Sequence, residues 1–341
     1  MLETIWFVIW GVAWAVYFML DGFDLGLGTL FPVLARSEAD KRVVINAMGP
    51  FWDGNEVWLI TAGGVTFAAF PRTYAVMFSS LYTPLLLLLF ALILRGVAFE
   101  FRGKVDSAAW RRTWDTCLVV GSFLPALLLG VAFANIFAGL PIDQAGVFHG
   151  TLLTLLNPYG LVGGLTFVMV FGVHGLVWLG TRTEGALQTY AGQLARRLWP
   201  VEALLAVVFL VMTGFCTPLW QNVLARPWLL PLPLLAVAGL LGTRVWIGRG
   251  AWWQAWFASS TLILGTVLFG VAGLFPNLLP SRLDPAASLT AFNSASSPLT
   301  LKIMLGVVLC LLPVVIGYQL WVYLTFRDTV TAASIQKGPA Y

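Results

Sequence analysis

Charged side chains are scarce in this sequence. Asp, Glu, Lys and Arg make up 10% of the 341 residues, whereas hydrophobic residues make up 59%. A soluble domain carries about 25% charged residues, and apolar stretches long enough to cross a hydrocarbon core of about 30 Å recur along this whole chain. The composition therefore excludes an ordinary soluble domain, and the net charge of +4 gives no reason to expect a nucleic-acid partner. We expect an all-α integral membrane protein in which residues 1–341 form one polytopic domain.

Histidine and cysteine are also rare. The two histidines, His149 and His174, are expected on opposite sides of the membrane, so they cannot form a haem ligand pair or a His-rich copper site. The three cysteines lie in apolar stretches without a CxxC spacing, and we expect them to be buried. A Gly-rich phosphate loop and a Ser-His-Asp set are missing as well. The sequence thus predicts neither a metal site nor a catalytic residue in this chain.

Nine apolar segments predict nine transmembrane helices. The first has no basic flank and no small-residue cleavage site, so we expect it to be retained as a helix. Residues 36–48 and 183–199 have the amphipathic pattern of helices at the membrane surface. Four helices on each side of a connecting segment would suit two four-helix bundles. The predicted spans are roughly 4–34, 51–70, 74–101, 114–138, 157–181, 200–224, 228–247, 254–276 and 301–326.

Lysine and arginine are unevenly distributed between the predicted loops. One side carries only Arg72, Arg226, Arg282 and Lys302. Because basic loops stay in the cytoplasm, we place the N-terminus outside and the C-terminus in the cytoplasm, which requires an odd number of spans. The cytoplasmic side then carries Arg36, Lys41, Arg42, Arg102, Lys104, Arg111, Arg112, Arg182, Arg196, Arg197, Arg244, Arg249, Arg327 and Lys337.

Four carboxylates lie in the first two predicted helices. Asp21 and Asp24 fall in the inner half of the first helix, and Asp53 and Glu56 fall in the first turns of the second. Residues three apart share a helix face, and the loop between these helices is short. We therefore expect all four carboxylates to gather near the cytoplasmic side. Intramembrane acids commonly mark proton or ion paths, so this group is a candidate proton pathway.

Some of these acids also have a structural interpretation. The helix macrodipole favours negative charge at a helix N-terminus, so Glu56 could be only a dipole partner. Asp24 could be the partner of an arginine from a cytoplasmic loop. Asp53, which lies among large apolar residues, and Asp21, which is far from any helix N-terminus, are the stronger functional candidates.

Four further polar residues are candidates for supporting roles. Arg95 and Glu100 are five apart, which is a poor same-face spacing, so Arg95 could instead neutralise an acid on the first two helices. A structural ion pair is the plainer interpretation of Arg95. His174 could relay protons or bind a headgroup, or be a core histidine with satisfied hydrogen bonds. Asn55 could hydrogen-bond among the acids.

The residues of the acidic group also carry a resemblance. The segments "MLDGFDLGLG", "GPFWDGNEVWLITAGGVTFAAFP" and "LRGVAFEFR" resemble subunit II of the cytochrome bd-type quinol oxidases, and so do "GVAFANIFAGLP", "LLNPYGLVGGL" and "SSPLTLKIMLGVVL". These stretches follow one another in family order from residue 3 to about residue 326.

The resemblance implies a subunit of an oxidase that oxidises quinol and reduces dioxygen to water in the cytoplasmic membrane of a bacterium or archaeon. It implies that two b-type haems and one d-type haem sit in subunit I, and that subunit II is a haem-free partner built from two four-helix bundles and a peripheral helix. Small single-helix accessory subunits and surrounding membrane lipid are further implied partners. Some members of the family also hold a structural quinone in subunit II.

The resemblance also implies roles for particular residues. Proton supply in the family runs partly along the subunit interface, and the pathway aspartate on the second helix matches Asp53, while its partner on the first helix matches Asp21. The family often has glutamine in place of Glu56, and His174 is not universal in it. Both residues therefore take supporting roles in this interpretation.

Two other classes of membrane protein share part of this pattern. A proton-coupled transporter would also use intramembrane acids, but it should have broken helices near the membrane centre and an inverted repeat. The acids here lie toward one side, and no repeat is evident. A dehydrogenase anchor that binds quinone and b haem would need histidines on facing helices, which this sequence does not supply.

Overall fold

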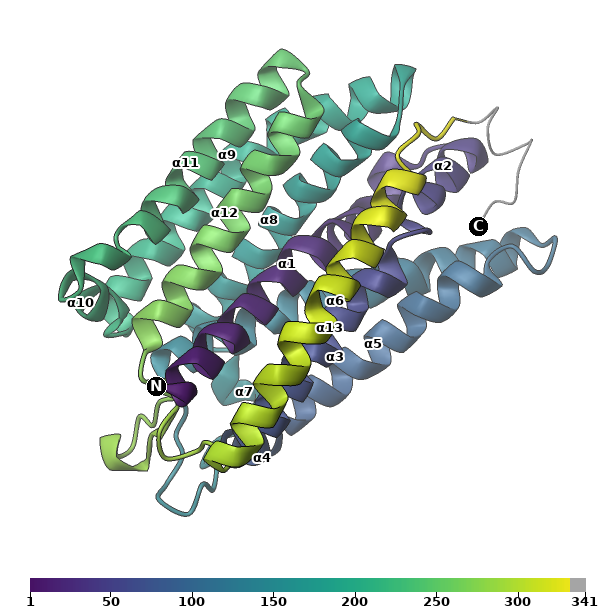
Figure 1. Cartoon of the computed structure of the whole chain (residues 1–341). Coiled ribbons are helices and arrows are strands. Elements are labelled where there is room, and N and C mark those ends of the chain that lie inside the picture. The colour runs from purple at the N-terminus through teal and green to yellow at the C-terminus, as the bar shows by residue number, and fades with distance from the viewer. Residues whose placement is uncertain (332–341) are drawn as a thin grey trace.

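The protein is described by a computed structural model over residues 1–331, and Lys337 of the predicted cytoplasmic set lies outside these residues. Long helices dominate the structure (Figure 1). Eight of those described are long and apolar enough to cross a membrane. They are α1 (Leu2–Leu34), α5 (Tyr82–Phe101), α6 (Ala108–Ala138), α8 (Pro158–Arg182), α9 (Gly185–Cys216), α11 (Pro231–Arg249), α12 (Trp252–Leu274) and α13 (Pro298–Thr325).

Shorter elements connect these helices. The helical ones are α2 (Glu38–Met48), α3 (Trp52–Ala69), α4 (Pro71–Ser80), α7 (Leu152–Leu155), α10 (Leu219–Leu224) and the 3-10 turns η1 (Pro227–Leu229) and η2 (Pro285–Ala287). The predicted loop 277–300 also contains a small antiparallel sheet of β1 (Asn277–Leu279) and β2 (Leu289–Thr290). The fold is therefore almost, but not entirely, α-helical.

The helix α3 corresponds to the predicted span 51–70 but is not among the eight apolar helices. Its first turns are polar, and these same turns hold the candidate site. It nevertheless runs antiparallel to α13 along its full length. At one end Ser296, just before α13, donates to the carbonyl of Ala69 at 2.9 Å; at the other end Tyr323 of α13 donates to Asn55 at 3.0 Å.

Three predicted boundaries are wrong. The predicted helix 74–101 is two helices, α4 and α5, which meet at Leu81. The amphipathic segment 183–199 is not a separate surface helix, because α9 continues through Pro200 to Cys216. The predicted span 200–224 is also not one helix, because α9 ends at Cys216 and α10 follows as a separate short helix. A proline is tolerated inside a membrane helix where neighbouring groups satisfy the freed carbonyl.

The prediction of buried cysteines is also wrong for Cys216 and Cys310, which are exposed on the described chain.

The helix α1 lies at the centre of the molecule and packs against α3, α6, α8 and α12 (Figure 1). Its contact with α8 is a close approach of two backbones. A Cβ placed on Gly175 would lie 2.8 Å from the backbone nitrogen of Leu27, and a Cβ on Gly26 would overlap the carbonyl of Phe171. Small residues at such crossings let membrane helices pack tightly.

The ends of the chain define two ends of the molecule. Trp6 in the first turns of α1 donates to the carbonyl of Leu301 at the start of α13, so α1 and α13 begin together. The last turns of α13 reach Phe51, which is next to the α2 segment. We call the end that holds α2 the α2 end, and the opposite end, which holds α4, α7 and α10, the α4 end (Figure 1).

Candidate functional site

A buried arginine joins three helices near the α2 end. The Nη2 atom of Arg95 on α5 donates to Asp21 Oδ1 on α1 at 2.7 Å and to Glu56 Oε2 on α3 at 2.9 Å. The side chains of Arg95 and Asp21 are fully buried, whereas that of Glu56 is 21% exposed. Arg95 therefore neutralises acids on the first two predicted spans, as one of the sequence hypotheses proposed, rather than pairing with Glu100.

A second polar group lies beside this ion pair. Asn55 on α3 donates to Asp24 Oδ2 at 2.8 Å and accepts hydrogen bonds from Tyr323 and Gln319 on α13. Trp58 in turn donates to Gln319. The alternative in which Asp24 pairs with an arginine from a loop is therefore wrong, since its partner is an amide. Asn55 hydrogen-bonds among the acids, as expected.

The two groups contain more carboxyls than cations. Asp21, Asp24 and Glu56 face a single guanidinium, and one oxygen of each aspartate has no hydrogen-bond partner among the described residues. The buried hydroxyl of Tyr17 lies beside Asp21, so it adds a further polar group to the site. Buried polar groups need partners, and a buried charge needs a counter-charge. An excess of carboxyl groups over cations is the composition that a proton-binding site requires.

The structure leaves two of the predicted acids outside this buried group. Asp53 is exposed in the first turn of α3, about one turn from Glu56. Glu100 is exposed at the end of α5. Of the four carboxylates that were expected to gather, Asp21, Asp24 and Glu56 form the buried group. Asp53 lies on the surface beside them. Asp53 and Glu56 lie on the part of α3 that leads from the α2 end to the buried ion pair.

His174 on α8 lies in the interior of the fold. Its Nδ1 lies 2.7 Å from Ser259 Oγ and its Nε2 lies 2.9 Å from the carbonyl oxygen of Met19. Both ring nitrogens are therefore occupied, which is the geometry of a core histidine with satisfied hydrogen bonds. The other histidine, His149, pairs with Asp143 in an exposed loop. His174 therefore offers no free nitrogen to a haem iron.

Sequence reasoning missed an ionic network at the α2 end. Arg102 Nη1 lies 2.7 Å from Glu38 Oε1, and Arg102 Nε lies 2.6 Å from Asp115 Oδ1. Lys41 also pairs with Asp115, at 2.7 Å. The hydrogen bond from Arg102 lowers the pKa of Glu38. The network ties α2 to the ends of α5 and α6. Its signal was the clustering of opposite charges in the cytoplasmic loops, which the sequence analysis used only for orientation.

Sequence reasoning also missed Glu202 on α9. Its side chain is buried, and neither carboxyl oxygen has a hydrogen-bond partner in the described part of the chain. A signal was available, because Glu202 is a lone acid at the start of the predicted span 200–224.

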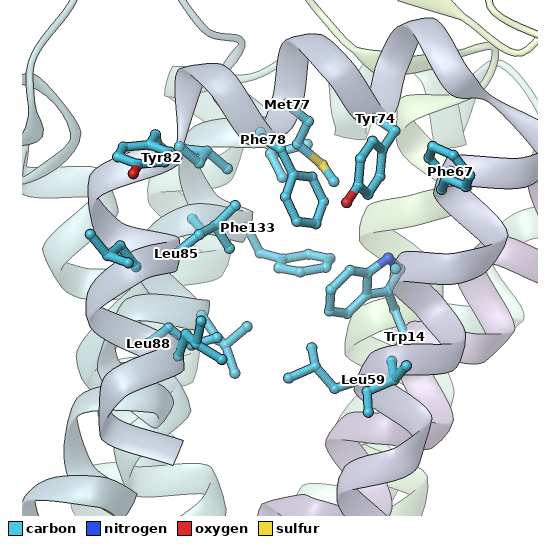
Figure 2. A pocket seen from close by; sticks show the side chains of 18 of the residues that line it. Trp14, Leu59, Phe67, Tyr74, Met77, Phe78, Tyr82, Leu85, Leu88 and Phe133 are labelled. Atoms are coloured by element: carbon cyan, nitrogen blue, oxygen red, sulfur yellow. The ribbon is translucent and has the colours of Figure 1, made fainter. Parts of the chain in front are cut away.

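A large apolar pocket opens between α1, α3, α4, α5 and α6, toward the α4 end. It has a volume of about 720 Å³. Figure 2 shows the rings of Trp14, Tyr74, Phe78 and Phe133 gathered around it, with Leu85 and Leu88 on the far wall. The indole nitrogen of Trp14 is buried and without a partner among the described residues. Because its lining is almost entirely apolar, the pocket is suited to an apolar molecule.

Comparison with known proteins agrees with the resemblance seen in the motifs. The model of the family "Cytochrome bd terminal oxidase subunit II" matches residues 2–326. The chain is 38% identical over 331 residues to the cytochrome bd ubiquinol oxidase subunit 2 of Bacillus subtilis, covering 97% of each chain. It is 34% identical over 373 residues to the cytochrome bd-I ubiquinol oxidase subunit 2 of Escherichia coli K12, covering 99% of this chain and 97% of that one.

The fold agrees with a solved structure as well. A chain of the bd oxidase from Geobacillus thermodenitrificans superimposes with a TM-score of 0.75 at 18% identity, covering 95% of this chain and 98% of that one. The family match spans almost the whole sequence, and every segment that carried the resemblance lies within it. The chain belongs to the cytochrome bd terminal oxidase subunit II family and is a membrane-embedded subunit of a terminal oxidase.

Proposed function

We propose that this chain is the haem-free subunit II of a quinol:oxygen oxidoreductase, where it stabilises a haem-bearing subunit I and lines a proton path to it. The observation that carries the proposal is the Arg95 bridge between Asp21 and Glu56, with the exposed Asp53 one turn away on α3. The complex would oxidise quinol and reduce dioxygen to water.

The proton path begins at the α2 end, on the cytoplasmic side. Asp53 takes up a proton at the surface, and Glu56 carries it inward to the side of Arg95 and Asp21. Asp24 and Asn55 form a branch on the other side of α3. The partly exposed position of Glu56 supports this order, because its side chain is 21% exposed and also contacts the buried Arg95. Arg95 keeps the carboxyls in place and supplies the counter-charge.

We propose nine spans, arranged as two four-helix bundles with α13 at the periphery. The antiparallel course of α3 along α13 supports a ninth crossing. One bundle consists of α1, α3, α5 and α6, and the other of α8, α9, α11 and α12. With nine crossings, the N-terminus is outside and the C-terminus cytoplasmic, in the cytoplasmic membrane of a bacterium or archaeon. This orientation fits the basic residues at the α2 end.

Subunit I is proposed to cover the exposed stripe of α3, which consists of Asp53, Val57, Ile60, Gly64 and Phe67. These residues recur at helical spacing on one face, and all are exposed on the described chain. Membrane lipid could cover the apolar members, but it would not accept a carboxylate such as Asp53. A protein neighbour with polar groups or water at the α2 end suits the whole stripe. Small single-helix accessory subunits would sit elsewhere on the apolar surface.

The haems, two b-type and one d-type, are proposed to lie in subunit I. The residues of this chain do not fit a haem, since both nitrogens of His174 are engaged within the fold and His149 is paired with Asp143. A structural quinone would instead fit the pocket of Figure 2, whose lining is nearly free of polar atoms. The Trp14 indole could donate to one of its ring carbonyls.

The proton path is tested by Asp53→Asn in the two-subunit complex. We expect the variant to assemble with unchanged haem spectra but to consume oxygen several-fold more slowly with quinol as the donor. Asp106→Asn is the matched control, because Asp106 is a 99% exposed acid beyond the end of α5. Normal oxygen consumption by Asp53→Asn would remove Asp53 from the path.

A further inference from the structure

Glu202 on α9 is a buried acid in the second group of helices, which consists of α8, α9, α11 and α12. Its side chain is 1% exposed, and both carboxyl oxygens lack a hydrogen bond among the described residues. Asp21 and Asp24 differ from it, because one oxygen of each is bonded to Arg95 or Asn55. Glu202 is therefore the more isolated acid, and the path proposed above makes no use of it.

Helix register places Glu202 within the bilayer. It lies 14 residues before Cys216, the last residue of α9, which is about 21 Å at 1.5 Å per residue. The exposed Arg197 lies five residues nearer the α2 end, or about 7.5 Å away along the axis. The nearest water is therefore at the α2 end, and Glu202 is separated from the exposed Arg197 by about one and a half helical turns.

A second buried group without a partner lies at the same depth. Trp199 donates to the carbonyl of Leu240, which sets the register of α9 against α11. Gly239 in turn packs against Leu262 and the carbonyl of Ala258 on α12. These contacts place Ser260 on α12 at about the same height along the helix axes as the turn of α9 that follows Trp199. The Ser260 hydroxyl is buried and has no hydrogen-bond partner in the described structure. Two partnerless polar groups thus lie at one level of the α9, α11 and α12 packing.

The cations near this level are engaged elsewhere. Arg196 donates to the carbonyls of Ile247 and Gly248 at the end of α11. The guanidinium of Arg244 lies over the ring of Trp199 at 5.9 Å. His174, on the neighbouring α8, is bonded to Ser259 and Met19. Glu202 forms no ion pair with any residue in the range 1–331.

A small pocket with a mostly apolar lining lies close to Glu202 along α9. The pocket, of about 90 Å³, begins at Ala206, one turn along α9 from Glu202, and includes the hydroxyl-bearing residues Thr166 and Thr266. An ionised carboxylate without a partner in such a place would be strongly destabilising, whereas a neutral carboxyl is tolerated.

We propose that Glu202 is a second, separate proton-binding site, which holds a proton between α8, α9, α11 and α12 and exchanges it with water from the α2 end. The proton is the ligand, and no covalent or redox step is involved. The site does not depend on the Asp53 path, because it lies in the other group of helices and shares no residue with it.

The test is infrared spectroscopy of the purified two-subunit complex. Subtracting the spectrum of Glu202→Gln from that of the unchanged protein is expected to reveal one C=O stretching band of a neutral carboxyl. This band should move to lower frequency after transfer to D2O. Glu100→Gln, which removes an exposed acid, should leave the band in place.

Two results would overturn the proposal. If the Glu202→Gln spectrum keeps every neutral-carboxyl band of the unchanged protein, Glu202 is ionised. A band that does not move in D2O would mean that the proton is sealed in and does not exchange. If the variant fails to assemble, dicyclohexylcarbodiimide, which reacts with neutral carboxyls in apolar surroundings, is applied to the unchanged complex. A carbodiimide adduct on the peptide that contains Glu202 supports the site. If other buried acids are labelled and Glu202 is not, the proposal is contradicted.

Discussion

Arg95 and Asp21 are held 2.7 Å apart with both side chains completely buried, although 74 residues separate them in the sequence. Their contact fixes α5 against α1, and the second contact of Arg95, with Glu56, adds α3. A buried pair of this kind is costly to break, because the remaining charge has no other partner. The ion pair is therefore both the frame of the proposed proton path and a structural element of the first group of helices.

Arg95→Leu is expected to destabilise the protein by about 3–5 kcal/mol, the usual cost of removing one partner of a buried pair. The measurement is the unfolding temperature of the detergent-purified complex, followed through its haem absorbance. Arg72→Leu is the control, since Arg72 is exposed and makes only one long hydrogen bond, to the carbonyl of Gln144. The double variant Arg95→Leu with Asp21→Leu should recover part of the loss. Equal unfolding temperatures for Arg95→Leu and Arg72→Leu would contradict a role for the pair in stability.

The pH dependence of stability should reveal the Glu38–Arg102 contact. Arg102 lowers the pKa of Glu38 below its ordinary value of 4.5. The contribution of the Glu38–Arg102 contact to stability is thus fully present above pH 4.5. It is lost as the pH falls through the lowered pKa of Glu38 in the folded state. The unfolding temperature of Glu38→Gln should lie below that of the unchanged protein at neutral pH, and the difference should shrink in acid. Because Glu38 is half exposed, the effect should also weaken in high salt. A difference that grew in acid would have the wrong sign for this contact.

The crossing of α1 and α8 should not tolerate added volume. A Cβ on Gly175 would lie 2.8 Å from backbone atoms of Phe23 and Leu27, so Gly175→Val would have to push the two helices apart. Overpacking of this kind typically costs about 1–3 kcal/mol. Gly306 on α13 has no atom within 4 Å of its virtual Cβ, and Gly306→Val is the matched control. The yield of folded complex should fall for the first variant and not for the second.

Much of this arrangement could be predicted from the sequence, because the lengths of the apolar segments and the positions of the charged residues between them indicate membrane helices directly. The acids Asp21 and Glu56 were identified from spacing alone, and the structure brings them to the same arginine. That arginine could be found only as one of two alternatives, since helical spacing says nothing about contacts between residues 39 or 74 positions apart. The exposed position of Asp53 was not predictable, because it depends on how α3 is rotated about its axis.

Other differences have local causes. The division at Leu81 is not marked by any charged loop. Pro200 stands where an amphipathic segment gives way to an apolar one, which predicted a helix start there, but α9 continues through it. Glu202 is a different case. A lone acid in an apolar stretch was visible in the sequence, but it had no neighbour at helical spacing and so did not form part of any pattern.

The pocket of Figure 2 provides the last prediction, which concerns the proposed structural quinone. Trp14→Phe keeps an aromatic ring in the wall but removes the buried N–H that has no partner in the described structure. A net hydrogen bond contributes about 0.5–1.5 kcal/mol, so we expect the quinone recovered by solvent extraction of the purified complex to fall by roughly two- to tenfold at limiting quinone.

Trp256→Phe is the matched control for this experiment. Trp256 on α12 is also buried, and its indole nitrogen also lacks a partner among residues 1–331, but it does not line the pocket. Any general effect of removing a buried indole N–H would therefore appear in both variants. Equal loss of quinone from the two would show that Trp14 does not bind it, and a complex that carries no quinone at all would remove the pocket from the proposed function while leaving the Asp53 path untouched.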